Sequence, residues 1–274
     1  MNWRSIWAIA RKDLMEVRQN KAAWGPAIIV PLIFAVIMPI FFVVLPQVIP
    51  VTDVERELGD IQTLMNSLPP NVKLIFDGLK LEQMFVIYMA AFMFAPMFLI
   101  MPLMFSSVVG ADSFAGERER KTMEALLYAP TSDLELFLGK VLAAVIPAVG
   151  ISWITDVVYI IVVNTTSFPL FGKIWFPLAP WWPMMFWLTP ALAVLGISAT
   201  VLISSRVKTF MEAYQMSASL VVLVLALIIG QVSGVLFLGV EMVLVIGTAI
   251  WLVNAALIYV AVSQFKRSAL IANL

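Results

Sequence analysis

The sequence predicts an all-α integral membrane protein with six transmembrane helices, on the strength of three observations. Of the 274 residues, 62% are hydrophobic and 12% are charged, whereas a soluble domain is nearer half apolar and a quarter charged. Several apolar runs exceed the roughly 18 residues that indicate a transmembrane helix. Lysine and arginine gather on alternate connectors between these runs, and six is the number of spans that keeps this alternation consistent.

The first 22 residues are expected to form an interfacial helix along the membrane surface rather than a cleaved signal. Apolar side chains recur here at helical spacing, and the cations fall largely outside that stripe. This pattern is typical of a helix that dips one side into a leaflet and turns its cations toward anionic headgroups. The alternative is an ordinary charged tail, which the regular stripe disfavours. The stripe consists of Trp3, Ile6, Trp7, Ala10, Leu14 and Val17.

The six expected spans cover residues 24–48, 84–110, 133–163, 183–205, 216–237 and 242–264. The first two carry interior prolines, and each proline removes a helical hydrogen-bond donor and favours a kink. Residues 49–83 form an extracellular connector, in which Thr52 and Glu55 predict a capped amphipathic helix. The link between the last two spans is so short that one of them could be partly re-entrant.

The distribution of cations predicts the orientation. Thirteen of the 17 lysines and arginines lie in the N-terminal arm, the 111–140 and 206–215 connectors and the C-terminal tail. The other side has Arg56, Lys73, Lys80 and Lys173. By the positive-inside rule, both termini and the 111–140 connector lie in the cytoplasm. The expected location is the plasma or inner membrane.

The connector between spans two and three holds the densest run of charge, five consecutive residues from Glu117 to Lys121. Opposite charges at i,i+4 (Glu117 with Lys121, Arg120 with Glu124) favour a surface helix. An apolar stripe follows, Pro130 disfavours continuation, and Ser132 with Glu135 predicts a capping box that opens the third span. Residues 111–131 are therefore expected to form a short amphipathic cytoplasmic helix, the alternative being a solvated loop.

Several kinds of chemistry are excluded or poorly supported. The chain has no Cys and no His, which excludes disulfides, Cys nucleophiles and His-based acid–base catalysis. No phosphate-binding loop, nucleophile constellation or metal-ligand cluster occurs. Asp156 is the one carboxylate well inside a predicted span, and an intramembrane acid is by default a functional candidate. Its place about 23 residues into the third span favours an interfacial residue in contact with water near the outer surface.

The connector motif resembles the first cytoplasmic loop of type-2 ABC transporter permeases, the exporter class. The similarity runs from Gly116 to Leu127, through Pro130, to Gly139-Lys140. Lys121 departs from the small residue usual before Thr122. The segments Ala10–Leu14 and Arg206–Gln215 are similar to the opening helix of the family and to its connector before the fifth span.

This resemblance implies a transmembrane subunit that pairs with a second permease subunit, as a homodimer or heterodimer, around a translocation route. A separate ATP-binding subunit would dock beneath each permease, so two copies are expected. The 111–131 helix would be the coupling helix that contacts it. This chain is then no enzyme and binds no cofactor, since ATP and magnesium belong to the partner. The expected coupling residues are Glu117, Arg118, Glu119, Arg120, Thr122, Glu124, Leu126, Leu127 and Pro130, with Arg206 and Glu212 as a weaker second contact.

The substrate is expected to be a lipid, drug, peptide or ion, and the lipid bilayer is the other partner; nucleic acid is not an expected one. Two alternatives stay open. An ATP-independent secondary transporter or channel needs polar or broken-helix sites near the membrane midplane, and the sequence has prolines but few such polar groups. A membrane scaffold or assembly factor would use the same cytoplasmic helix to recruit a partner.

Overall fold

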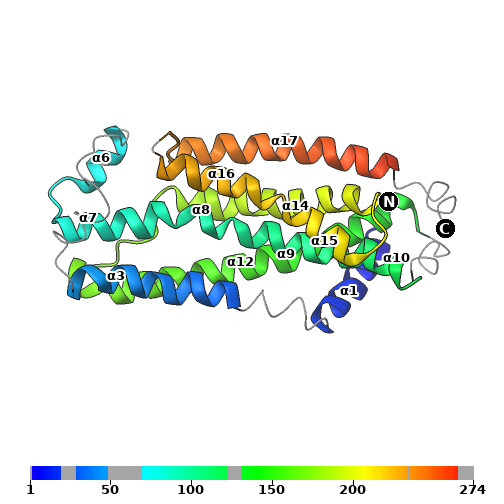
Figure 1. The fold of residues 1–274 in the computed structure, drawn as a ribbon, viewed down its shortest axis with the longest axis horizontal. Helices are drawn as coiled ribbons and strands as arrows, with labels where there is room; N and C mark the ends of the chain where they lie inside the picture. Colours follow the sequence, from blue (N-terminus) through cyan, green and yellow to red (C-terminus); the bar gives the residue numbers. More distant parts are fainter. Residues whose placement is uncertain (1, 20–28, 49–69, 123–130, 234, 265–274) are drawn as a thin grey trace.

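The structure, a computed structural model, describes residues 2–19, 29–48, 70–122, 131–233 and 235–264, and these ranges contain helices and no strand. Figure 1 shows the long helices side by side in an elongated bundle. Five of them are long and apolar enough to cross a membrane, and a shorter apolar helix covers Ile29–Val44. The predicted all-α membrane fold is thereby confirmed. The Thr52–Glu55 capping box lies outside the described residues.

The five long helices are Leu81–Glu119, Asp133–Phe171, Trp181–Ser204, Phe210–Val232 and Val240–Ala261. Several are divided into labelled segments. The N-terminal part comprises α1 (Trp3–Gln19), η1 (Ile33–Ile37), α3 (Met38–Val48) and α6 (Pro70–Phe76). The first long helix comprises α7 (Leu81–Ile87), η2 (Tyr88–Met93), α8 (Ala95–Phe98), α9 (Ile100–Ala111), η3 (Asp112–Gly116) and α10 (Glu117–Glu119). The remainder comprises α12 (Asp133–Phe171), α13 (Trp181–Pro183), η4 (Met184–Leu188), α14 (Thr189–Ser204), α15 (Phe210–Ala218), α16 (Val221–Val232) and α17 (Val240–Gln264).

Two helices continue beyond the spans expected from hydropathy. The helix of span two runs on to Glu119, and α12 continues to Phe171. Gly172, at a φ of 66°, ends α12 in the left-handed conformation that glycine adopts without strain. The connector expected at 206–215 is shorter, because α15 starts at Phe210 after its N-cap Thr209. Hydropathy marks the lipid-embedded part of a helix, whereas local capping decides where it ends.

Proline explains three of the π-helical segments along these helices, but not η3, which has no proline near it. Three π-helical segments end two or three residues before a proline: η1 before Pro39, η2 before Pro96 and η4 before Pro190. A proline lacks the N–H that would bond to the carbonyl four residues earlier, and its ring crowds that carbonyl. A wider π turn in front of the proline accommodates both effects.

The break before Pro96 exposes three consecutive carbonyls, which side chains from three other elements satisfy. The Ala90 carbonyl accepts from Tyr159 Oη at 2.7 Å, the Ala91 carbonyl from Trp181 Nε1 at 2.8 Å, and the Phe92 carbonyl from Gln231 Nε2 at 2.5 Å. An unpaired backbone group is costly within a bilayer. These bonds therefore join the outer half of span two to α12, α13 and α16.

Close packing of small residues joins α9 to α14. A Cβ on Gly196 would lie 2.6 Å from the Leu103 carbonyl oxygen and 2.2 Å from Ser106 Oγ. Small residues at such seams let two membrane helices approach each other closely. This seam fixes span two in the middle of the bundle.

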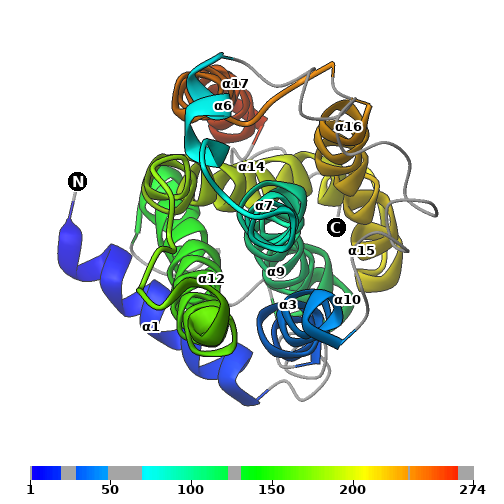
Figure 2. The same ribbon diagram turned by 90° about the vertical axis from the view of Figure 1, so that its left-hand side faces the viewer.

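The elements sort clearly to the two ends of the bundle. In Figure 1, α1, α10 and the turn between α14 and α15 lie toward one end, called the inner end here, and α6 lies at the opposite, outer end. Figure 2 looks along the bundle and shows α1 crosswise to the long helices, against α12. The inner end is where the sequence concentrates its charge.

Candidate functional site

The inner end is built around a buried lysine. Lys140 lies in the second turn of α12 and its side chain is 0% exposed. Its Nζ lies 2.6 Å from Glu117 Oε2, 3.2 Å from Asp13 Oδ2 and 2.8 Å from the Ser113 carbonyl oxygen. An ammonium group has three donors, and all three are directed to acceptors from α1, η3 and α10. The buried charge is therefore compensated by two carboxylates, and it joins three elements.

Gly139 is the reason that α1 can come so close to Lys140. A Cβ at this position would lie 2.8 Å from Ile9 Cβ and 3.0 Å from the Ile6 carbonyl oxygen. α1 therefore crosses α12 in direct contact with the backbone at Gly139, and Ile6, Ile9 and Ala10 are buried at this crossing. The two residues of the Gly-Lys motif therefore act together. Gly139 lets α1 approach closely because it has no side chain, and Lys140 forms an ion pair with Asp13 of α1.

Lys12 forms a second set of ion pairs on the solvent side of this cluster. Its Nζ lies 2.8 Å from Glu117 Oε1, 3.2 Å from Asp13 Oδ1 and 3.1 Å from Glu16 Oε1. Partial burial lowers the pKa of Lys12, but the hydrogen bond to Glu117 and the charges of Asp13 and Glu117 outweigh it, so the pKa is raised overall. Asp13, Glu16 and Glu117 lie close enough together to hold a metal ion, but Lys12 already contacts all three carboxylates.

Arg118 and Glu119 tie the end of span two to the turn that leads into α15. Arg118 Nη1 donates to the Val207 carbonyl at 3.2 Å, and Glu119 Oε2 accepts from the Phe210 N–H at 2.9 Å. The same turn is ordered locally, because Thr209 Oγ1 accepts from the Glu212 N–H and Glu212 Oε2 accepts from the Lys208 N–H. Span two is thus linked at one level to α1, α12 and α15.

A capped helix end follows directly. The Thr122 N–H donates to the Glu117 carbonyl at 2.9 Å, and the Lys121 N–H to the Arg118 carbonyl at 3.0 Å. This pair of bonds is a Schellman motif, in which the residue after the C-cap adopts the left-handed conformation. Lys121 does so with a φ of 58°. The chain therefore turns away from the helix axis at Lys121.

The expected i,i+4 pairing of Glu117 with Lys121 is wrong, because the α-helix ends at Glu119. Glu117 pairs with Lys140 and Lys12 instead, and Arg120 pairs with Asp112 at 2.8 Å. The helical periodicity of the sequence could not reveal this, since the competing partners come from segments far away in the chain. The capping box that opens the third span is confirmed: Ser132 Oγ accepts from the Glu135 N–H at 3.3 Å, and Glu135 Oε2 accepts from the Ser132 N–H at 3.1 Å.

Comparison with known proteins decides the family. The family model described as ABC-2 family transporter protein matches residues 7–252. The chain belongs to the ABC-2 transporter family. The predicted type-2 ABC permease is thereby confirmed at the level of family, and the matched region includes the whole inner-end cluster. No curated protein matches the chain.

The described structure brings together only some of the residues predicted to contact an ATP-binding subunit. In this ABC-2 chain Glu117 is 1% exposed and forms ion pairs with Lys12 and Lys140. Glu119, Arg120 and Thr122 are exposed. Arg206 and Glu212 are exposed on the neighbouring turn. The remaining predicted contacts, Glu124, Leu126, Leu127 and Pro130, lie outside the described residues and stay a prediction.

Four residues of the cluster were not among the predicted site residues: Lys12, Asp13, Glu16 and Lys140. A signal for two of them is present in the sequence. Lys140 interrupts an otherwise apolar run at the start of span three, and Asp13 falls on the same helical face as Ile6 and Val17. An acid on the apolar face of one helix and a cation in an apolar run of another are complementary. Their contact across 127 residues of chain has no local signature.

Asp156 does not lie where the sequence suggested. It was expected at the outer surface in contact with water, but its side chain is 3% exposed. The helix continues past it to Phe171, so the outer end of α12 lies well beyond it. Among the described residues none donates a hydrogen bond or forms an ion pair with Asp156. The expected contact with water is therefore wrong, and Asp156 is a buried carboxyl group inside the bundle.

Proposed function

We propose that this ABC-2 chain is the transmembrane subunit of an ATP-driven exporter and that it couples to a separate ATP-binding subunit through residues 111–131. The observation that carries the proposal is the inner-end junction. There Glu117, Arg118 and Glu119 tie the last turn of span two to α1, α12 and the turn before α15. The segment predicted to contact the partner follows this junction directly.

The junction would transmit movement of the partner to the spans. The left-handed residue Lys121 gives the chain a defined exit direction from α10. A displacement of the following segment would act on a buried ion cluster shared by three elements rather than on one flexible loop. Nucleotide can shift the spans only if its two states differ in their contacts at this point. A junction of charge-assisted hydrogen bonds, which are roughly twice as strong as neutral ones, supports such a role.

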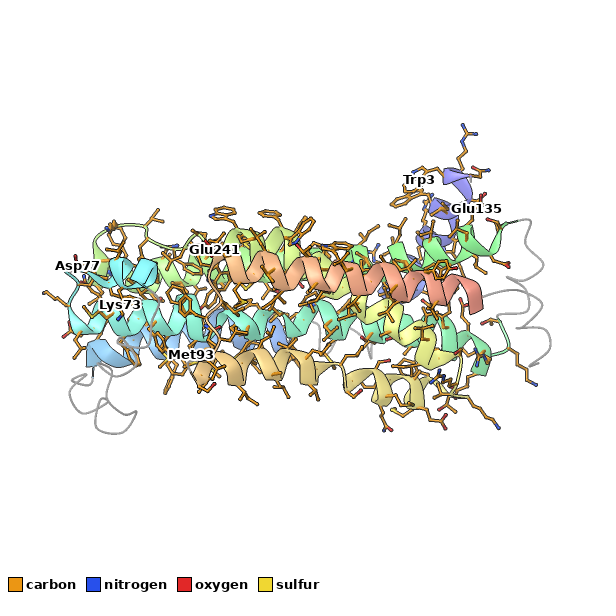
Figure 3. All side chains as sticks on the ribbon, turned by 90° about the horizontal axis from the view of Figure 1, so that it is seen from above. Trp3, Lys73, Asp77, Met93, Glu135 and Glu241 are labelled. Carbon is orange, nitrogen blue, oxygen red and sulfur yellow. The ribbon has the colours of Figure 1, made fainter. Side chains whose placement is uncertain are left out.

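The orientation, composition and cargo of the complex belong to the same proposal. Both termini face the cytoplasm of a plasma or inner membrane, because most of the described cations belong to the inner end, whereas Lys73 lies on α6 at the outer end (Figure 3) and Lys80 and Lys173 adjoin the outer ends of α7 and α12. A second permease subunit, identical or different, completes the pathway. Two ATP-binding subunits bind ATP and magnesium, and this chain binds neither. The cargo is a lipid, drug, peptide or ion.

One observation favours the alternative of an ATP-independent transporter. Asp156 is a buried carboxyl group without an ion pair among the described residues, and intramembrane acids frequently mark ion or proton pathways. Transport driven by an ion gradient in membranes that lack ATP would support this alternative. The family assignment and the inner-end junction favour the ATP-driven exporter.

Copurification from membranes of the native organism tests the proposal. The wild-type chain is compared with Glu124→Arg plus Leu127→Asp, and with a matched control, Glu82→Arg plus Leu74→Asp, which makes the same two changes toward the outer end. We expect an ATP-binding protein to copurify with the wild type and the control but not with the inner-end variant. Absence of any ATPase with the wild type, or equal loss from both variants, would overturn the proposal.

A further inference from the structure

The helix α1 has two faces with different surroundings. One face packs on α12 and buries Ile6, Ile9, Ala10 and Val17. The helix lies crosswise to the long helices (Figure 2), so its axis runs in the plane in which a membrane surface would lie. Figure 3 shows Trp3 on the part of α1 that stands out from the side of the bundle, close to Glu135. The second face is therefore free to meet whatever surrounds the inner end.

That second face carries a row of arginines beside two tryptophans. Arg4, Arg11 and Arg18 recur every seven residues, and all three are exposed. At about 100° per residue they fall within one strip some 40° wide. Trp3, 63% exposed, and Trp7, 48% exposed, lie along the edge of the strip. The hydrophobic stripe expected from the sequence is thus divided: Ile6, Ala10 and Val17 are buried against protein, whereas the two tryptophans are exposed.

The arginine row is uncompensated within the part of the chain that the structure describes. Lys12, on the same helix, pairs with three carboxylates. None of the described residues forms an ion pair with Arg4, Arg11 or Arg18. The two acids of α1, Asp13 and Glu16, are engaged by Lys12 on the far side of the helix. The exposed surface of α1 therefore presents three positive charges in a line that form no ion pair with a described residue, and the one exposed acid of this helix, Glu16, is paired with Lys12.

We propose that α1 binds the headgroups of anionic phospholipids through Arg4, Arg11 and Arg18, with Trp3 and Trp7 at headgroup level. An anionic leaflet supplies the complementary charge along the whole row, and arginine matches phosphate oxygens with its planar fork of donors. Tryptophan is favoured where one side of a side chain is apolar and the other is wet. A helix crosswise to the spans presents all five side chains to one leaflet at once.

Lipid bound to α1 would also affect the inner-end junction. The opposite face of α1 carries Asp13, which is paired with Lys140. Lipids that hold α1 in place would thereby hold the buried cluster in place as well. Anionic lipid is expected to stabilise the junction whether or not an ATP-binding subunit is present. Lipid binding therefore does not rest on the proposed function, and its failure can be observed separately.

The test measures lipid retained by the full-length chain. Protein in detergent is equilibrated with equal amounts of phosphatidylglycerol and phosphatidylcholine, and bound lipid is counted by native mass spectrometry. We expect the wild type to retain phosphatidylglycerol preferentially. Each basic residue near an anionic surface contributes about fivefold in affinity, so Arg4→Gln, Arg11→Gln and Arg18→Gln together should reduce that preference at least about tenfold.

Two further variants make the result specific. The triple Arg→Lys variant keeps the charge and should keep most of the preference. Lys73→Gln, Lys80→Gln and Lys173→Gln together remove the same charge from exposed positions toward the outer end and should leave the preference unchanged. Equal retention by the wild type and the Arg→Gln variant overturns the proposal, as does an equal loss in the outer-end control, which would indicate net charge alone.

A second measurement needs no arginine substitution. The chain contains no Cys, so Ala8→Cys introduces a single thiol on the exposed side of α1, next to the arginine row. We expect this thiol to react more slowly with a membrane-impermeant maleimide in nanodiscs that contain phosphatidylglycerol than in phosphatidylcholine alone, and high salt should reduce the difference. An unchanged rate overturns the proposal.

Discussion

One helix, Leu81–Glu119, is held at two places by two different kinds of interaction. At its outer half, neutral side chains from Tyr159, Trp181 and Gln231 donate to three carbonyls freed by a proline break. At its inner end, Glu117 and its neighbours are held by buried and half-buried charges. The neutral donors satisfy backbone groups in the apolar outer half of the helix, whereas the ion pairs lie at the inner end, where the sequence concentrates its charge.

The difference suggests separate roles for the two regions. Charge pairs respond strongly to the loss of one partner, because an uncompensated buried charge remains. Hydrogen bonds between neutral groups contribute less, roughly 0.6–1 kcal/mol each. The inner end is therefore the more sensitive region, and a partner that moves it would have a large effect on the spans. At the helical break before Pro96, neutral hydrogen bonds alone hold span two against its neighbours.

The largest expected effect is at Lys140. Lys140→Met removes the cation that pairs with Glu117 and Asp13 and should reduce the free energy of unfolding by about 3 kcal/mol. The value lies at the lower end of the usual range because Lys12 still faces both carboxylates. Denaturant unfolding in detergent measures it. Lys173→Met, at an exposed position, is the control and should change stability by less than about 0.5 kcal/mol.

A second substitution breaks the inner end without changing charge. A Cβ at position 139 would lie only 2.8 Å from Ile9 Cβ. Gly139→Val should therefore reduce the free energy of unfolding by about 1–3 kcal/mol through overpacking. It should also displace α1 and make a cysteine at Ala8 react faster. Gly150→Val is the matched control on the same helix, since a Cβ there meets nothing within 4 Å. Equal effects at the two glycines would show that α1 is not seated at Gly139.

The outer region should respond more weakly. Tyr159→Phe removes the donor to the Ala90 carbonyl but keeps the ring packed between Phe98 and Trp181. The expected loss is about 1 kcal/mol, the ordinary net contribution of one hydrogen bond. Thermal unfolding in detergent compares it with Lys140→Met. A loss as large as that of Lys140→Met would contradict the difference drawn between the two regions.

The smallest effect is expected at the helix end. A non-glycine residue in the left-handed conformation costs roughly 1–2 kcal/mol, so Lys121→Gly should relieve part of this strain and stabilise the chain by about 0.5–1 kcal/mol. Lys121→Val should destabilise it. The ordering Gly, Lys, Val in unfolding experiments would confirm the capped end, and a destabilising glycine would argue against it.

Local features of the fold could be predicted from the sequence, and long-range ones could not. The Ser132–Glu135 capping box and the helical breaks before Pro39 and Pro96 follow from neighbouring residues. The amphipathic pattern of α1 indicated a two-faced helix, but periodicity does not say which face meets protein and which is free. The pairing of Lys140 with Asp13 and Glu117 depends on the crossing of α1 over Gly139, a tertiary contact without a local signal. Asp156 was misplaced because hydropathy gives a residue's position along a span but does not say which side of α12 the other helices cover.

The most direct measurement is a double-mutant cycle on Glu117 and Lys140, read as the free energy of unfolding. Glu117→Gln, Lys140→Met and the combined variant are compared with the wild type. Because the combined variant removes both charges and leaves Asp13 facing Lys12, we expect it to be less destabilised than the sum of the single variants, by at least about 1.5 kcal/mol. If the two effects are additive within about 0.5 kcal/mol, Glu117 does not interact with Lys140. That result would contradict the account that Glu117 is neutralised inside the chain, and Glu117 would again be a candidate for direct contact with a partner.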